Sequence, residues 1–189
     1  MRYLGIDPGL RGALAVLDDR ERLAIFDTPT VMVRRRKRRR SGQTSMTAVE
    51  EYMISEIVQL LRRFSPEADM ASHAMLEWNN PRPHESVTSA HKAGVGAGIW
   101  LAVLSAVGIP CTKVPPSKWK PAMLSRATGG DKNASTLRAQ ELFPYAQLVR
   151  RNRRDGKGDH NRAEALLLAE FCRRSFNGTL ALNLEELEV

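Results

Sequence analysis

The chain has 189 residues and a formal net charge of +8, a length that fits one domain with a full core. Its two cysteines, Cys111 and Cys172, are far apart and lack CxxC or Cys/His spacing, which argues against a disulfide framework and a structural zinc site. The sequence shows no secretory signal and no apolar stretch of about 18 residues, so we expect a soluble intracellular protein without a membrane partner.

The positive charge is concentrated in one run, which supplies seven of the eight net charges and leaves +1 for the rest. Such a local excess fits a basic loop laid on phosphates better than a uniformly charged surface. A second basic cluster lies in another loop-like stretch. Either cluster alone could also be a solvated or a targeting segment. The two clusters consist of Arg34, Arg35, Arg36, Lys37, Arg38, Arg39 and Arg40, and of Arg150, Arg151, Arg153 and Arg154.

Residues 2–6, 12–18 and 21–27 predict three short strands in an antiparallel meander. Asp7 stands between the first two, directly before Pro8 and Gly9, so a hairpin would hold its carboxylate at the end of a sheet. That position suits a divalent metal ion. Asp7 can equally be a turn acid that accepts hydrogen bonds from nearby backbone N–H groups.

The middle of the chain predicts a loop, a helix, a strand and a second helix. Residues 31–46 are basic and polar and predict an exposed loop, and apolar side chains at helical spacing predict a helix over 48–64. The strand predicted over 70–78 ends with Glu77, which is either a second metal ligand or a strand-end acid paired with an arginine. The helix over 89–107 holds three glycines, which indicates close packing against the sheet or a second subunit. These glycines are Gly94, Gly96 and Gly98.

The last third predicts a strand over 109–114, a short helix capped by Ser117, and helices over 134–143 and 160–174. Lys118 and Lys120 flank Trp119, and this group could contact a DNA backbone. It could equally be a tryptophan that closes the core beside two solvated lysines. Residues 1–175 are therefore predicted to form one domain, with 176–189 as a weakly ordered tail.

The predicted last helix and its N-cap contain further candidate metal-binding acids. Asp159 stands at its expected N-cap, while His160 and Glu164 are four residues apart and share one helical face. Glu164 lies among apolar residues, where an acid is costly to bury without a partner. Two alternatives are that Asp159 is a simple helix cap and that His160 is a solvent-facing residue. Together with Asp7 and Glu77, however, these side chains could hold two magnesium ions for phosphodiester hydrolysis.

Three motifs in order resemble the RuvC family of Holliday junction resolvases. They are Gly5-Ile6-Asp7-Pro8-Gly9, Met75-Leu76-Glu77, and the run from Asp159 to Leu166, Asp-His-Asn-Arg-Ala-Glu-Ala-Leu. Within the family the chain is most similar to the chloroplast resolvases of plants and algae and their bacterial and phage relatives. That branch shares Asp27-Thr28-Pro29 before basic residues, and the Val114-Pro115 and Trp119-Lys120 segment.

The resemblance implies an α/β protein with an RNase H-like fold, a mixed sheet flanked by helices. It further implies a homodimer that binds branched DNA and makes symmetric paired nicks in four-way junctions during recombination and repair, with two Mg²⁺ ions that Mn²⁺ can replace. Asp7, Glu77 and Glu164 match the family's acids. Many bacterial members carry the fourth acid where this chain has Asn161, whereas the chloroplast-like pattern puts it at Asp159. We therefore expect Asp159 as the fourth ligand and His160 as a secondary ligand or base.

Two other classes of function compete with this one. The chain could be a non-catalytic module that binds branched nucleic acid and whose acids are structural. It could also be an ATP-dependent phosphotransferase of the actin-like type, although 189 residues are too few for that two-lobed architecture. The expected location is the chloroplast nucleoid, or otherwise the cytoplasm of a bacterium or of a phage-infected cell.

Overall fold

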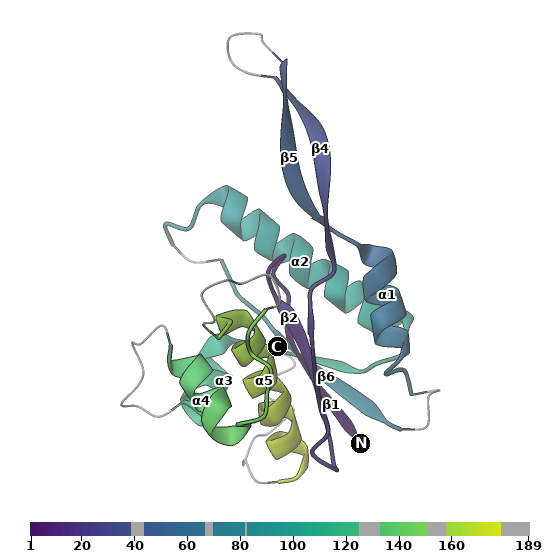
Figure 1. The fold of residues 1–189 in the computed structure, drawn as a ribbon, viewed down its shortest axis with the longest axis vertical. Helices are drawn as coiled ribbons and strands as arrows, with labels where there is room; N and C mark the ends of the chain where they lie inside the picture. Colours follow the sequence, from purple (N-terminus) through teal and green to yellow (C-terminus); the bar gives the residue numbers. More distant parts are fainter. Residues whose placement is uncertain (39–43, 67–69, 82, 125–132, 151–157, 179–189) are drawn as a thin grey trace.

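A mixed five-stranded sheet with helices on both faces forms the body of the protein (Figure 1). The computed structural model describes residues 1–38, 44–66, 70–81, 83–124, 133–150 and 158–178. The strand order is β3-β2-β1-β6-β7, with antiparallel pairing on the β2 side of β1 and parallel pairing on the β6 side. This arrangement confirms the α/β prediction. The strands are β1 (Arg2–Asp7), β2 (Ala13–Asp18), β3 (Leu23–Asp27), β6 (Ser72–Glu77) and β7 (Cys111–Val114).

The helices form two layers that bury the two faces of the sheet. One core joins the strands to α5 through buried side chains such as Trp119 and Phe171, and the other joins them to α1 and α2 through Trp100 and Leu61. Within the described ranges, no helix is long and apolar enough to cross a membrane. The helices are α1 (Ile54–Arg62), α2 (Val87–Ala106), α3 (Pro116–Met123), α4 (Ala134–Leu142) and α5 (His160–Phe176).

The central strand β1 is apolar on both sides because it is covered on both sides. Leu4 and Ile6 belong to the core under α1 and α2, while Tyr3 belongs to the core under α5. Gly5 also faces α5, and a Cβ at this position would lie 2.1 Å from the backbone oxygen of Ala165. Glycine is therefore required here, and it lets the backbone of α5 lie directly on the strand that ends in Asp7.

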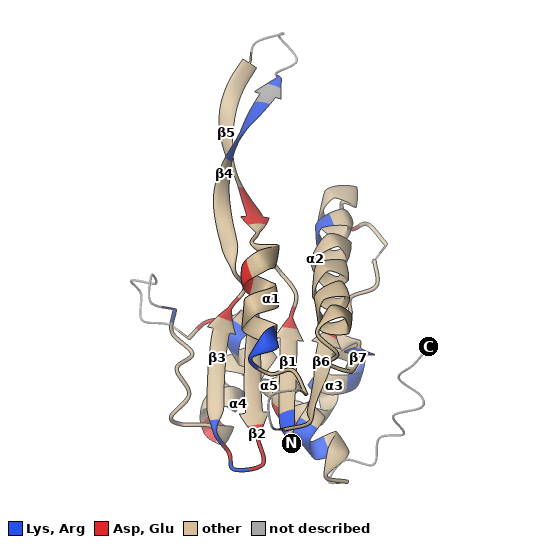
Figure 2. Cartoon of the chain, turned by 90° about the vertical axis from the view of Figure 1, so that its right-hand side faces the viewer, with Lys and Arg blue, Asp and Glu red and all other residues tan. Residues whose placement is uncertain are grey.

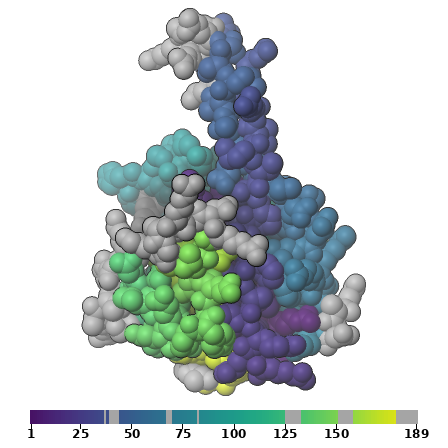
Figure 3. All heavy atoms as spheres, in the orientation of Figure 1, coloured from purple at the N-terminus to yellow at the C-terminus, as the bar shows by residue number. Residues whose placement is uncertain are grey.

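The predicted basic loop over 31–46 is wrong, because most of this segment is paired β-structure. β4 (Thr30–Arg38) and β5 (Thr44–Tyr52) pair in antiparallel register and form a two-stranded ribbon, here called the arm, which projects from the body (Figures 1 and 3). Val33 lies opposite Val49, and β-branched residues favour this conformation. The run of basic residues had favoured the loop prediction over this β-strand preference.

The arm also changes where the first helix begins. Residues 48–52 belong to β5, so α1 starts at Ile54 rather than near residue 48. The predicted Ser117 cap is likewise wrong, because α3 begins at Pro116 after Pro115 and has no side-chain cap. Proline at the first helical position lacks only an N–H that would have no partner in the helix. The other predicted strands and helices are found with their ends shifted by a few residues.

Candidate metal centre and nucleic-acid interface

Asp7 and Glu77 end two neighbouring parallel strands. Ile6 pairs with Leu76 in the register of β1 and β6, and each acid follows directly after its member of that pair. Since side chains alternate along a strand, Asp7 lies on the same face as Gly5, and Glu77 on the same face as Met75, which packs under α5. β1 and β6 run side by side toward the same end of the sheet (Figure 2), so both carboxylates lie at that end and toward α5.

Glu77 is held by two side chains on either side of its carboxylate. Trp119 Nε1 donates to Oε2 at 3.0 Å, and Asn79 Nδ2 donates to Oε1 at 2.9 Å. Trp119 is fully buried, so it closes the core, as one of the two sequence interpretations held. Its second role, orienting a carboxylate, was not predicted, and only its position five residues after the end of β7 hinted at it.

Glu164 reaches the same region from the second turn of α5. Its Oε1 lies 2.5 Å from Lys120 Nζ, 3.2 Å from His160 Nε2, and accepts a hydrogen bond from Ser135 Oγ at 3.1 Å. Burial raises the pKa of Glu164, but the hydrogen bonds from His160 and Lys120 outweigh it and hold that pKa below its usual value. The same bond to Glu164 raises the pKa of His160. Lys120 therefore lies against an acid, whereas Lys118 is exposed.

Asp7 has the most unusual electrostatic environment of these acids. Burial, and then the negative charge of Glu77, raise its pKa to about 7, while the backbone N–H of Gly9 donates to Oδ1 at 3.3 Å and opposes the shift. Glu164 raises this pKa further and His160 lowers it, so three neighbouring side chains act on Asp7. A buried pair of carboxylates with too little positive charge nearby is a favourable setting for a hard divalent cation.

The oxygen-rich donor set of Asp7, Glu77 and Glu164, with the imidazole of His160, fits Mg²⁺ or Mn²⁺ in chemistry. In the side-chain arrangement of the described ranges, no group of three or more His, Cys, Asp or Glu is gathered closely enough to hold a metal ion. Lys120 and Trp119 occupy oxygens of two of these acids. Metal binding would therefore require side-chain rearrangement around the carboxylates.

Asp159 has different partners. It is the N-cap of α5, and its Oδ1 accepts hydrogen bonds from the backbone N–H groups of Asn161 at 3.0 Å and Arg162 at 3.1 Å. Its Oδ2 accepts from Arg150 Nε at 2.6 Å. The capping role foreseen as an alternative is therefore present, and an arginine partner is added to it. Its role as a metal ligand stays a prediction.

Two cavities flank the candidate centre. One, of about 310 Å³, is lined by Asp7, Glu77, Asn79 and the α2 residues Ala93 and Ala97, among others. The other, of about 810 Å³, lies on the side of the α5 N-terminus and includes His160 and Asp159 in its lining. Residues of the candidate centre thus line both cavities.

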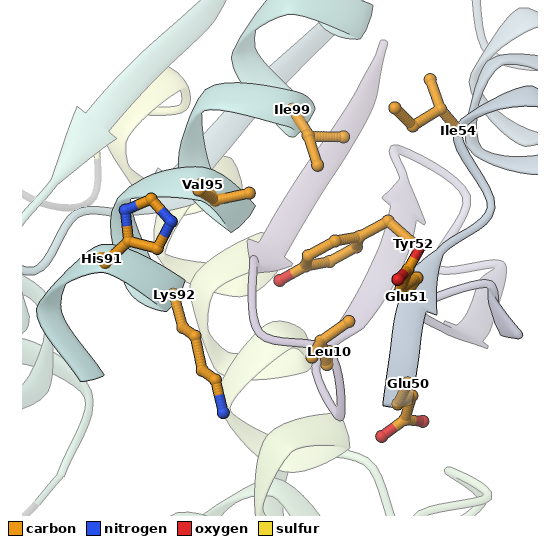
Figure 4. A pocket seen from close by; sticks show the side chains of 9 residues that line it. All are labelled: Leu10, Glu50, Glu51, Tyr52, Ile54, His91, Lys92, Val95 and Ile99. Atoms are coloured by element: carbon orange, nitrogen blue, oxygen red, sulfur yellow. The ribbon is translucent and has the colours of Figure 1, made fainter. Parts of the chain in front are cut away.

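A third cavity, of about 330 Å³, separates the base of the arm from α2 (Figure 4). Tyr52, the last residue of β5, crosses its floor and donates a hydrogen bond from Oη to the backbone oxygen of Pro8 at 3.0 Å. Gly96 of α2 makes this contact possible, because a Cβ there would lie 2.4 Å from Tyr52 Oη and 2.5 Å from that oxygen. Of the three glycines, Gly96 confirms the packing prediction, whereas Gly94 and Gly98 face open space.

The residues of the two basic clusters fall into three groups. Arg34, Arg35, Arg36 and Arg38 are exposed on the outer part of β4, where Figure 2 shows the positive charge of the arm. Arg150 contacts Asp159 instead of projecting into solvent. The remaining ones, Arg39, Arg40, Arg151, Arg153, Arg154 and the side chain of Lys37, lie outside the described residues.

Solved structures of RuvC from Thermus thermophilus are similar to this chain. One is 18% identical with a TM-score of 0.52 and covers 95% of this chain and 98% of that chain. A second, RuvC in complex with a Holliday junction substrate, is 16% identical with a TM-score of 0.52 and covers 96% and 97%. The chain has a RuvC-like fold. No protein-family model matches the sequence, and no curated protein matches it either.

The RuvC-like fold confirms the predicted α/β architecture over nearly the whole chain. Both neighbours described above are bacterial, and the comparisons give no support to the more specific likeness to chloroplast resolvases. At these levels of identity the comparisons establish the fold and leave the chemistry to the residues of this chain.

The pKa of Asp7 predicts how the stability of the metal-free protein depends on pH. Its folded-state pKa of about 7 exceeds the ordinary value of 3.8, so the folded state binds the extra proton and stability falls as pH rises through this window. The loss between pH 5 and pH 8 is up to about 2.6 kcal/mol. Thermal unfolding should show a Tm lower by several degrees at pH 8, and Mg²⁺ should raise that Tm more at pH 8 than at pH 5.

Asp7→Asn provides the control for this prediction. The variant cannot gain the charge, so its Tm should vary much less between pH 5 and pH 8 than that of the wild-type protein. His160 contributes in the same direction as Asp7, and Glu164 is already ionised throughout this range. A wild-type Tm that rises with pH in the absence of metal would contradict the assignment.

Proposed function

We propose that the protein is a magnesium-dependent endonuclease that resolves four-way DNA junctions by paired symmetric nicks. The observation that carries this proposal is that Asp7 and Glu77 end neighbouring strands of a RuvC-like sheet, where Glu77 and Glu164 are near enough to raise the pKa of Asp7. The neighbour bound to a Holliday junction substrate supports branched DNA as the ligand. The charged arm supplies a second surface for a polyanion.

Each residue of the centre has a role in the proposed reaction. Asp7, Glu77 and Glu164 would hold two Mg²⁺ ions, which activate water and stabilise the leaving oxygen of a phosphodiester when bound. Trp119 and Asn79 fix the Glu77 carboxylate. His160, hydrogen-bonded to Glu164, would accept a proton at its Nε2 atom or serve as a further ligand. Lys120 would balance the charge of Glu164 whenever no metal is present.

Paired nicking requires two centres, so we propose that the working form is a homodimer. The exposed side of α2 supports this, since Val87 and Val95 are 85% and 42% exposed and a Cβ at Gly94 or Gly98 would meet nothing within 4 Å. Small residues of this kind allow two helices to approach closely. Location in the chloroplast nucleoid rests only on the sequence resemblance.

The decisive experiment is a cleavage assay with Mg²⁺ on end-labelled four-way, Y-shaped and linear duplex DNA. We expect nicks at symmetric positions in two opposing strands of the four-way junction and little cutting of the linear duplex. Mn²⁺ should substitute, and chelation should stop the reaction. A wild-type protein that binds the junction but is inert with both metals would favour the non-catalytic binding module.

A further inference from the structure

Arg150 is held from several sides beside the candidate centre. Its Nε donates to Asp159 Oδ2 at 2.6 Å, and its Nη2 donates to Asp159 Oδ1 at 3.3 Å and to the backbone oxygen of Gly12 at 3.3 Å. Nη2 also donates to the backbone oxygen of Arg11. Both carbonyls belong to the turn that follows Asp7. A side chain with so many bonds is fixed in one orientation before any ligand arrives.

Asp159 has both of its oxygens engaged in this arrangement. Oδ1 caps α5 through two backbone N–H groups and Oδ2 receives Arg150. A carboxylate has room for about four hydrogen bonds, so these contacts nearly fill its capacity. By contrast, within the described part of the chain Asp7 receives a single long hydrogen bond, from Gly9. Of the two, Asp7 is the carboxylate with room for a cation, and Asp159 serves to orient an arginine.

A second ion pair continues the row of charges. Arg162 donates to Asp27 through Nε at 2.7 Å and through Nη2 at 2.8 Å, which is a bidentate pair. Arg150 Nε lies 3.6 Å from the same Asp27. Because the charge of Asp27 is already neutralised by Arg162, Asp27 offsets little of the positive charge of Arg150. The positive charge of Arg150 is therefore opposed mainly by Asp159.

The cavity of about 810 Å³ opens beside this row and also borders His160. Arg150, whose side chain is 21% exposed, lies in its wall together with Arg11 and Asn161. Thr28, only 5% exposed, belongs to the same wall, and its hydroxyl has no hydrogen-bond partner among the described residues. A buried hydroxyl without a partner among the described residues is free to donate to an acceptor in the cavity once its side chain turns toward it.

We propose that this cavity is a phosphate subsite, in which Arg150 and Thr28 bind a backbone phosphate of the DNA strand next to the metal centre. Asp159 acts there as a positioning residue for Arg150. This inference rests on the proposed function, because the cavity borders His160, which lies 3.2 Å from Glu164 of the candidate centre. Arginine suits the task because its planar fork pairs with phosphate oxygens.

Two variants separate this role from metal binding. Asp159→Ser keeps a hydroxyl that caps the helix but loses the carboxylate, and Arg150→Gln removes the charge directly. Calorimetric titration with Mn²⁺ in the absence of DNA should give wild-type affinity for both variants, whereas Asp7→Asn should bind at least tenfold more weakly. If Asp159→Ser loses metal as Asp7→Asn does, Asp159 is a ligand and its positioning role is rejected.

The phosphate contact itself is tested with four-way junctions that carry a single neutral methylphosphonate linkage at successive positions, with Ca²⁺ replacing Mg²⁺. At one linkage near the cut, the wild-type protein should lose affinity about tenfold. Arg150→Gln and Asp159→Ser should start with that loss and show no further loss at the same linkage. Their salt dependence should fall by about one unit in slope. Arg62→Gln, an exposed arginine on α1, should behave as the wild-type protein.

The outcomes also distinguish the subsite from the nuclease. If the wild-type protein binds and cleaves junctions but Arg150→Gln keeps the wild-type methylphosphonate profile, only the subsite is rejected. If the wild-type protein neither binds nor cleaves junctions, the proposed function fails first and the subsite fails with it. Thr28→Val should reduce affinity at the same linkage by a smaller factor than Arg150→Gln, and an effect at a different linkage would count against a shared site.

Discussion

Asp7→Asn is expected to lower the rate of junction cleavage at least 1,000-fold while junction affinity in Ca²⁺ stays within a few-fold of the wild-type value. The amide keeps the size of the side chain but cannot supply a negative oxygen to a metal ion, and metal activation of water is worth several kcal/mol. The measurement is single-turnover cleavage together with a binding titration on the same four-way junction.

The matched control is Glu141→Gln, an exposed acid on α4 whose partner is Arg138. It should cleave at the wild-type rate. Asp7→Asn should also make the metal-free protein more stable at pH 8, because it removes a buried charge that lacks a cation. A variant that folds, binds junctions and still cleaves at the wild-type rate would show that Asp7 is an ordinary turn acid.

Neutralising one face of the arm should produce the second large effect. Arg34, Arg36 and Arg38 alternate with Arg35 along β4 and therefore project to the same side. Changing the three to Gln should weaken junction affinity about 100-fold near physiological salt and reduce the salt-dependence slope by up to about three. Affinity measured across a salt series gives both quantities.

Arg35→Gln is the comparison for this variant. Its guanidinium already pairs with Glu51 at 2.5 Å, on the other face of the ribbon, so its loss should change affinity less than one third as much on a logarithmic scale. Equal affinity of the triple variant and the wild-type protein at every salt concentration would mean that the arm does not contact DNA.

What the sequence could predict depended on local patterns. Asp7 and Glu77 were recognisable because each interrupts an apolar strand at its end, and the parallel register of β1 and β6 then sets them side by side. Glu164 was recognisable because an acid inside an apolar helix face needs a partner. These features follow from the periodicity of a single segment.

What it could not predict depended on contacts between distant segments. Trp119, one of the two hydrogen-bond donors to Glu77, is 42 residues away along the chain, and Asp27 and Arg162 are 135 residues apart. Arg150 looked like part of a basic loop because its position along the chain gives no sign that Asp159 and two turn carbonyls hold its guanidinium in place. The arm was missed for a related reason, since charge and β-propensity conflict in β4 and only pairing with β5 decides between them.

Tyr52 connects the arm to the candidate metal centre. The ribbon ends at this residue, and its hydroxyl holds the carbonyl of Pro8, one peptide unit beyond Asp7. Gly96 packs tightly against this contact, because any side chain there would collide with the Tyr52 hydroxyl and the Pro8 carbonyl. The base of the arm is thus tied by a hydrogen bond to the turn that follows Asp7. In the proposed nuclease, a force on the arm would therefore be transmitted through Tyr52 to the turn beside Asp7.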